Sequence, residues 1–93
     1  MIGSFRNKET QRLWLRRYSR RVPPELHRAA WRKLAMLDAA ERLNDLRLPP
    51  GNRLERLTGD REGEYSIRIN EQWRVCFQWH EGNAHAVEIT DYH

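Results

Sequence analysis

The first half of the chain has the hydrophobic spacing of helices. In residues 7–21, apolar side chains recur at Leu13, Trp14 and Tyr18. Asn7 precedes them as a capping residue, and basic residues end the segment, as is typical of the two ends of a helix. The pattern predicts a first helix that begins after Asn7.

A second, longer helix is predicted in residues 22–46. Pro23 and Pro24 favour a helix start, and Glu25 lies in the first turn. At helical spacing, one face of this segment collects a set of mainly apolar residues. They are Leu26, Ala30, Leu34, Leu37 and either Ala40 or Glu41.

After residue 46 the hydrophobic period changes to two. Residues 47–53 contain two prolines and a glycine and predict a surface loop. Alternating apolar and polar positions then predict a short strand in residues 54–57, a hairpin in residues 64–79 and a last strand at the chain end. The opening MIGSF predicts a further strand, at an edge or in the centre of the sheet.

This order predicts an α+β fold in which two helices pack on one face of a small, mostly antiparallel sheet. Ninety-three residues allow one domain, residues 1–93. No apolar run approaches the roughly 18 residues of a membrane helix. The single cysteine, Cys76, cannot form an intramolecular disulfide. We therefore expect a cytoplasmic protein with no membrane contact.

Positive charge is concentrated in the first half of the chain. Residues 1–48 carry 12 Lys or Arg against 5 Asp or Glu, whereas residues 49–93 carry 5 against 8. Fifteen of the 17 basic residues are Arg, whose planar fork suits phosphate and carboxylate groups. GC-rich codon usage explains the arginine excess equally well, but any long-range attraction to polyanions lies mainly in the first half.

The hairpin segment, EYSIRINEQWRVCFQW, raises a question about its arginines. Its apolar residues share one face, and the shortest register that allows this pairs Ile69 with Trp73. The same register sets Arg68 opposite Arg74, on the side away from the packed face. Directly opposed like charges destabilise a sheet by up to about 1 kcal/mol. Some other interaction should offset this repulsion.

Two explanations of the arginine pair are open. In the first, both guanidinium groups turn into water or pair with acids such as Glu88, as surface ion pairs commonly do. In the second, the two forks hold an anion, most simply a phosphate.

The chain end supplies groups that exchange protons. Asp91, Tyr92 and His93 provide an acid, a phenol and an imidazole. Cleavage of RNA by its own 2′-hydroxyl needs a base for the 2′ proton, cations for the charge on phosphorus, and an acid for the departing 5′ oxygen. The arginine pair and the chain end together match these needs.

Other chemistry has less support. The four histidines lack metal-binding spacing and a cysteine partner, so we expect no metal and no cofactor. No phosphate-binding glycine loop and no nucleophile elbow is present. Cys76 alternates onto the face of Arg74, which could lower its pKa, but without a designated base we interpret it as a spectator thiol. The four tryptophans are interpreted mainly as packing residues.

The same residues closely resemble a known family. The segment PPGNRLERLTGDREGEYSIRINEQWRVCFQW, the terminal EITDYH and the opening MIGSF resemble the HigB, or plasmid-maintenance-killer, branch of the RelE/ParE toxin superfamily. The resemblance implies a RelE-type fold and a ribosome-dependent endoribonuclease that cleaves translated mRNA in the ribosomal A site without a metal. It also implies a HigA-like helix-turn-helix antitoxin, through whose complex alone the protein would reach operator DNA.

The resemblance also implies site residues. Arg74 matches the phosphate-binding arginine of the family, and Asp91, Tyr92 and His93 match its C-terminal catalytic cluster. Further arginines are expected to bind RNA: Arg53, Arg56, Arg61 and Arg68. The basic helix residues Arg16, Arg17, Arg20 and Arg32 are expected to dock on the ribosome or RNA.

The sequence departs from the family in the strand before the G-D-R motif. Some relatives have a histidine and a lysine there, where this chain has Glu55 and Thr58. Three alternatives are therefore open: His93 acts alone with Tyr92, Glu55 is the base, or cleavage is weak. Arg53 and Arg56 could supply the positive charge that the lysine would have given. Two other functions stay open, because a fold does not determine an activity. They are inhibition of DNA gyrase, as in the ParE branch, and non-enzymatic RNA binding.

Overall fold

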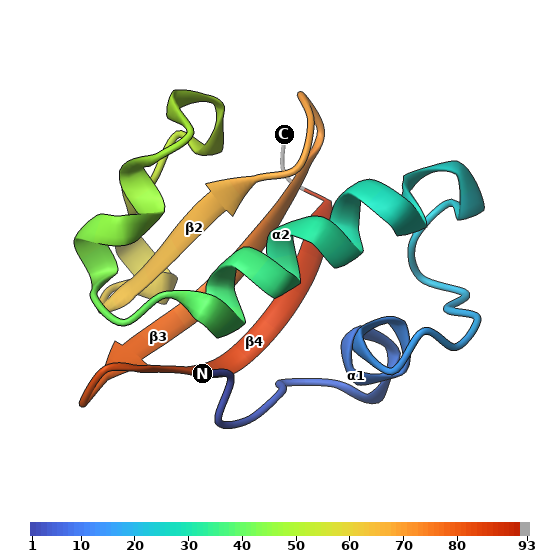
Figure 1. Cartoon of the computed structure of the whole chain (residues 1–93), viewed down its shortest axis with the longest axis horizontal. Coiled ribbons are helices and arrows are strands. Elements are labelled where there is room, and N and C mark those ends of the chain that lie inside the picture. The colour runs from blue at the N-terminus through green and yellow to red at the C-terminus, as the bar shows by residue number, and fades with distance from the viewer. Residues whose placement is uncertain (92–93) are drawn as a thin grey trace.

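The computed structural model describes residues 1–91 and has one helical layer against one sheet (Figure 1). The helices are α1 (Lys8–Trp14) and α2 (His27–Ala39), and the strands are β1 (Glu55–Arg56), β2 (Glu64–Arg68), β3 (Trp73–His80) and β4 (Asn83–Asp91). Short 3₁₀ turns connect them: η1 (Pro24–Leu26), η2 (Leu43–Arg47), η3 (Pro50–Asn52) and η4 (Gly59–Arg61). The predicted α+β class is confirmed.

The four strands form an antiparallel sheet in the order β1-β2-β3-β4. The opening residues add a parallel edge beside β4, through bridges from Ile2 to Ala84 and from Phe5 to Val87. In place of the predicted opening strand, the structure has two isolated bridges at the sheet edge. A register shift in β3 and β4 between Cys76 and Gln78 lets both Ala84 and Val87 join the core although they are three residues apart.

Helix α1 begins where it was predicted and ends earlier. The Asn7 side chain accepts a hydrogen bond from the backbone N–H of Thr10, which caps the helix. After Trp14 the chain leaves the helix, and Arg16 takes a left-handed conformation with φ of 59°. The prediction that Tyr18 belongs to this helix was therefore wrong.

Helix α2 is also shorter than predicted. The expected core face is confirmed for Ala30, Leu34 and Leu37, which are fully buried. The helix ends at Ala39 because the carboxylate of Asp45 accepts hydrogen bonds from the backbone N–H groups of Glu41 and Arg42. These bonds start the separate turn η2.

The segment predicted as a surface loop contains a buried polar anchor. Asn52 is fully buried, and its amide donates to the carbonyl oxygens of Leu46 and Leu48. The amine of Lys33, on α2, donates to the Asn52 side-chain oxygen at 2.6 Å, and burial lowers the pKa of Lys33. The loop is thus tied to α2 rather than lying loosely on the surface.

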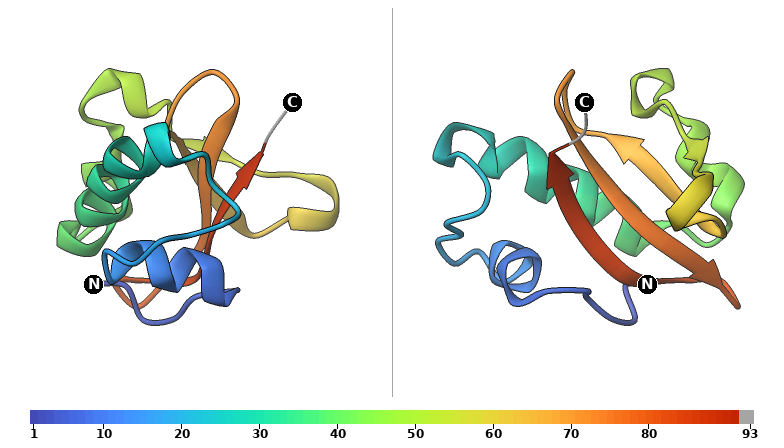
Figure 2. Two further views of the ribbon diagram at one scale, coloured as in Figure 1. Left: turned by 90° about the vertical axis from the view of Figure 1, so that its right-hand side faces the viewer. Right: turned by 180° about the vertical axis from the view of Figure 1, so that it is seen from behind.

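The core lies between α2 and one face of the sheet. Its members include Leu34, Leu37, Ile67, Val75, Phe77 and Ile89. Figure 2 shows α2 on one side of the sheet and the turn η4 on the other. Helix α1 lies against α2 and along β4, where its Thr10 hydroxyl accepts a hydrogen bond from the backbone N–H of Ile89. The second face of the sheet is therefore left uncovered by helices.

Within residues 1–91 no helix is long and apolar enough to cross a membrane.

Candidate active site

The opposed arginines lie on the face of the sheet that the helices leave uncovered. Arg68 is the direct partner of Arg74 in the ladder between β2 and β3, as predicted. The two side chains turn in different directions. Arg68 donates to the carbonyl oxygen of Asn70 in the hairpin turn and pairs with Glu71 at 3.9 Å. The forks therefore diverge, which relieves the repulsion between them.

Arg74 turns the other way and is nearly enclosed by protein. Its Nε donates to the hydroxyl of Ser66 at 2.7 Å, and its Nη2 donates to the carbonyl oxygen of Arg53 at 2.6 Å. The carboxylate of Glu55 lies 3.9 Å from the same nitrogen. Arg74 is only 7% exposed, so its guanidinium is enclosed by protein and does not turn into water, although it lies on the sheet face away from the core. Its head is preorganised, because a buried fork held by such bonds has little freedom left.

Glu55 and Arg53 form the rim around Arg74, whereas Arg56 lies elsewhere. Glu55 is opposite Ser66 in the ladder, and its side chain is 52% exposed. Arg53 is exposed and has a left-handed backbone, with φ of 44°. Arg56 is opposite Tyr65, and its guanidinium lies 5.8 Å from the centre of that ring. Because Tyr65 points to the core side, the structure separates Arg56 from the Arg74 cluster.

Next to Arg74 on the same face lies a network of four ion-paired residues. Arg61 of η4 donates to Glu88 at 2.8 Å and to Glu64 at 3.2 Å. Arg6 pairs with the same two acids, at 3.2 Å to Glu64 and 3.9 Å to Glu88. In one of the two explanations left open above, acids such as Glu88 pair with the opposed arginines, whereas the structure shows Glu88 paired with Arg61 and Arg6. The network ties the opening segment and the G-D-R turn to the sheet.

Cys76 is buried on this face, beneath the ion-paired network. Burial raises the pKa of its thiol to about 11, against a smaller opposing effect of Arg61. Arg74 does lower this pKa, as suggested, but its effect is small beside that of burial, and the thiol is uncharged at neutral pH. Its interpretation as a spectator is thereby strengthened.

The chain-end cluster is only partly described. Asp91 is exposed, accepts a hydrogen bond from the Gln72 side chain at 3.1 Å and is opposite Trp73 in the ladder. Thr90, its neighbour, is opposite Arg74. The strand β4 therefore ends beside the arginine pair. Tyr92 and His93 lie outside the described residues, and their roles stay predictions.

Two parts of the site were missed in the sequence. Ser66 was not singled out, although the register that opposes Arg68 and Arg74 already puts it on the same face. Arg6 was missed because its partners, Glu64 and Glu88, lie 58 and 82 residues away along the chain. Among residues 1–91 there is no cluster of three or more His, Cys, Asp or Glu side chains that could hold a metal ion.

We expect loss of Glu88 to lower stability. Glu88 is nearly buried, so Glu88→Ala leaves Arg61 and Arg6 facing a hole without their shared acid. A hydrogen bond to a charged group contributes about 1.5–3 kcal/mol. We discount this toward 1–2 kcal/mol, roughly, because the two arginines are about one third exposed. The melting temperature should fall by about 4–8 °C per kcal/mol.

The matched control for Glu88 is Glu71→Ala. The Glu71 side chain is 96% exposed and pairs with Arg68 at only 3.9 Å, so its loss should be nearly neutral. A double-mutant cycle of Glu88→Ala with Arg61→Ala then measures the coupling across the network. Strictly additive effects would contradict the interpretation of the network as one structural unit.

Comparison with known proteins places the chain in a family. Residues 3–93 match the family described as RelE-like toxin of type II toxin-antitoxin system HigB. Toxin HigB-1 of Vibrio cholerae is 51% identical over 65 residues, which cover 70% of this chain and 68% of that protein. Endoribonuclease HigB of Proteus vulgaris is 32% identical over 93 residues, which cover the whole of both chains.

A solved structure supports the fold independently. The crystal structure of a YafQ mutant from E. coli superposes with a TM-score of 0.64 and covers 98% of this chain and 93% of that one, at 12% sequence identity. At this identity the likeness concerns the fold alone. Together with the family match over nearly the whole chain, it confirms the resemblance noted in the sequence. The chain belongs to the RelE-like HigB toxins of type II toxin-antitoxin systems.

Proposed function

We propose that the protein is an endoribonuclease toxin that cuts mRNA during translation, with the Arg74 face of the sheet as its active site. The observation that carries this proposal is the buried, preorganised fork of Arg74, set between Ser66 and the half-exposed Glu55 on the sheet face away from α2. The named activity of the full-length relative from Proteus vulgaris, an endoribonuclease, supports the same reaction.

In the proposed mechanism the arginines stabilise charge on the scissile phosphate. The Arg74 fork is fixed before substrate arrives, so it needs little reorganisation when negative charge develops on phosphorus. Arg68 lies opposite Arg74, and its guanidinium is held by one hydrogen bond to the Asn70 carbonyl oxygen and a 3.9 Å pair with the exposed Glu71, so it can turn toward a second phosphate oxygen. Arg53 adds positive charge at the rim. The 2′-hydroxyl attacks phosphorus, the bond to the 5′ oxygen breaks, and a 2′,3′-cyclic phosphate results.

Proton transfer is assigned to the chain end. His93 with Tyr92 takes the 2′ proton and protonates the 5′ oxygen, and Asp91 supports them. Glu55 is the second candidate base. It lies beside Arg74 at 3.9 Å and is half exposed, so an incoming phosphate displaces it easily from the guanidinium. Arg61, whose fork is bound by Glu64 and Glu88, is proposed to act by holding the η4 turn at the edge of the RNA path.

The partners follow from this function. A type II toxin has an antitoxin, and we propose one of the HigA-like helix-turn-helix kind that also carries the toxin to operator DNA. The ribosome supplies the mRNA in its A site. The location of the reaction is accordingly the cytoplasm.

The test is a toe-printing assay on ribosomes translating a defined message. Purified protein should introduce new stops within the A-site codon, and addition of the antitoxin should abolish them. The same message without ribosomes separates ribosome-dependent cleavage from a general nuclease. A supercoiling assay with DNA gyrase tests the gyrase alternative, and gyrase inhibition without any mRNA cleavage would overturn the proposal. If the protein binds RNA but cleaves it in none of these assays, the result would favour a non-enzymatic RNA-binding module.

A further inference from the structure

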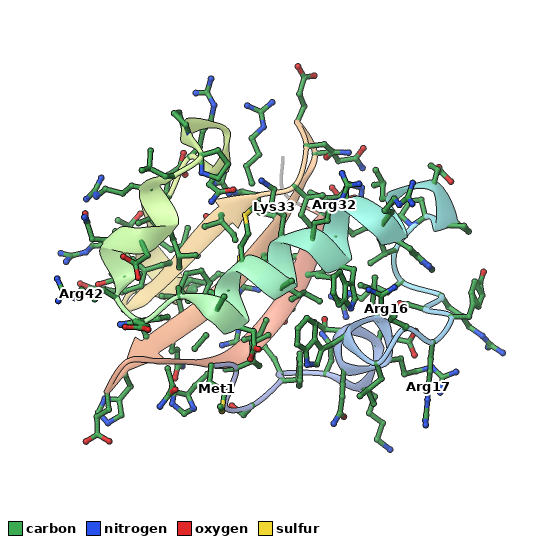
Figure 3. All side chains as sticks on the ribbon, in the orientation of Figure 1. Met1, Arg16, Arg17, Arg32, Lys33 and Arg42 are labelled. Atoms are coloured by element: carbon green, nitrogen blue, oxygen red, sulfur yellow. The ribbon has the colours of Figure 1, made fainter. Side chains whose placement is uncertain are left out.

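A concave surface lies on the helical side of the protein, away from the Arg74 face. It is a hollow of about 510 Å³ between the end of α1 and the start of α2. We call it the α1–α2 groove. Figure 3 shows Arg16 and Arg17 on the α1 side of this region and Arg32 on α2. The residues that line it are Leu13, Arg16, Arg17, Tyr18, Pro24, His27, Arg28, Trp31 and Arg32.

The groove is held in shape by contacts of its own. The guanidinium of Arg16 lies 3.9 Å from the centre of the Trp31 ring, and Trp14 stacks on Trp31 with ring centres 5.5 Å apart. The Trp31 indole N–H donates to the Trp14 carbonyl oxygen. Arg16 has φ of 59°, a left-handed conformation that is costly for any residue other than glycine. The cation–π contact helps to offset this cost.

The chain after α1 is anchored as well. Glu9 accepts hydrogen bonds from the backbone N–H of Arg20 at 2.8 Å and from the hydroxyl of Ser19 at 3.2 Å. The first of these bonds is the main reason why the pKa of Glu9 is lowered. Arg12 donates to the carbonyl oxygen of Tyr18. The groove therefore exists before a partner binds, which reduces the entropic cost of association.

The charge of the groove fits an acidic partner. Four of its lining residues are arginines, and among the described residues none of those lining it is acidic. Arg28 and Arg32 are four residues apart on α2, so they project from the same side one helical turn apart. Between the arginines, Leu13, Pro24 and Trp31 supply apolar surface. Carboxylates at similar spacing with apolar side chains between them would match this pattern.

A peptide fits these features better than RNA does. The Trp31 ring is already in contact with Arg16 and Trp14, which leaves it poorly placed to stack on a base, as single-stranded RNA requires. The proposed RNA site also lies across the sheet, on the face that carries Arg74. A molecule bound at the groove is therefore separate from the substrate.

We propose that the α1–α2 groove is the docking site for an acidic, partly apolar segment of the antitoxin. This proposal rests on the proposed function, because it assumes an antitoxin partner. The arginines attract the acidic segment and pair with its carboxylates, and the apolar floor receives its hydrophobic side chains. Such charge pairs set specificity and the rate of association and weaken as salt increases.

The test compares two charge reversals of equal size. In the first variant, Arg28→Glu and Arg32→Glu change the groove. In the control, Arg42→Glu and Arg47→Glu change exposed residues outside it. The probe is the purified antitoxin encoded with this chain, and calorimetry gives its dissociation constant at low and high salt. We expect the groove variant to bind at least about 100-fold more weakly at low salt, or roughly 2.7 kcal/mol, and the control to bind within about 3-fold of wild type.

Further measurements keep the proposal falsifiable. Far-ultraviolet circular dichroism and melting confirm that the groove variant is folded. If it is not, phenylglyoxal footprinting of the wild-type complex replaces it, and Arg28 and Arg32 should be protected by the antitoxin. Equal antitoxin affinity of both variants, or no protection, overturns the proposal. The proposal is also overturned if the groove variant no longer binds a single-stranded 12-mer RNA but still binds the antitoxin.

The result is distinguishable from failure of the proposed function. In the toe-printing assay, cleavage by each protein is compared with and without added antitoxin, and the antitoxin should reduce cleavage by the groove variant far less than it reduces wild-type cleavage. A wild-type protein that binds the antitoxin through the groove but never cuts mRNA would refute the endoribonuclease assignment and leave the docking site standing. If the wild-type protein cuts mRNA but the groove arginines do not contribute to antitoxin binding, the docking site is refuted and the endoribonuclease assignment stands.

Discussion

Arg74→Lys should lose about 10²–10³-fold of its cleavage rate on the ribosome, because removing one preorganised donor to developing negative charge typically costs that much. Lysine keeps the positive charge but loses the planar fork that contacts Ser66 and the Arg53 carbonyl oxygen together. Single-turnover cleavage of a message bound to stalled ribosomes measures the rate. A lysine variant that cleaves at the wild-type rate would show that positive charge alone, and not the planar fork, stabilises the negative charge that develops on phosphorus.

Arg74→Ala should lose activity and stability together. Its removal leaves the Ser66 hydroxyl and the Arg53 carbonyl oxygen without this donor in a nearly closed site. A buried polar group left without its partner costs about 1–3 kcal/mol, which is a melting shift of several degrees in a domain of this size. The activity of the alanine variant is therefore informative only beside its melting curve. Arg42→Ala, at an exposed position just before η2 (Figure 3), is the control for loss of one arginine.

The sheet could be predicted from the sequence because apolar and polar side chains alternate along its central strands, β2 and β3. Alternation of period two fixes which residues share a face, and a slip of one residue would move Ile67 and Val75 out of the core. The opposition of Arg68 and Arg74 follows from that constraint alone. The helix ends were predicted less well, since they depend on single contacts. The carboxylate of Asp45 ends α2, and no periodic pattern records such a contact.

The surroundings of the site could be predicted less well than the site itself. The motif residues led to Arg74 and Glu55, and the structure brings these two together. Burial of Arg74 depends on the Arg53 carbonyl oxygen, 21 residues away in the chain, in a segment that was expected to be a surface loop. The partners of Glu88 likewise come from the opening segment and from η4. Long-range polar pairing of this kind has no sequence period, so only the structure reveals it.

The second large effect concerns the chain end. Deleting Tyr92 and His93 should lower cleavage by about 10²–10⁴-fold, the usual contribution of a positioned general acid or base. Among the described residues, the last one of β4 that belongs to the buried core is Ile89, and we expect the truncated protein to melt near the wild-type temperature. It should also bind the antitoxin with unchanged affinity, because the α1–α2 groove is built from residues 13–32. Single-turnover cleavage, melting and calorimetry on one preparation give all three results.

His93→Gln separates the imidazole from the phenol. A histidine with its ordinary pKa of roughly 6.5 acts as a base only when it is deprotonated. If His93 is the base, the wild-type rate should therefore rise as pH increases through that region, and the glutamine variant should lose this rise as well as most of its rate. Glu55→Gln is the matched comparison, because Glu55 lies beside Arg74 and is the other candidate base. If the truncated protein cuts at the wild-type rate while Glu55→Gln does not, the base is Glu55 and the assignment to the chain end is wrong.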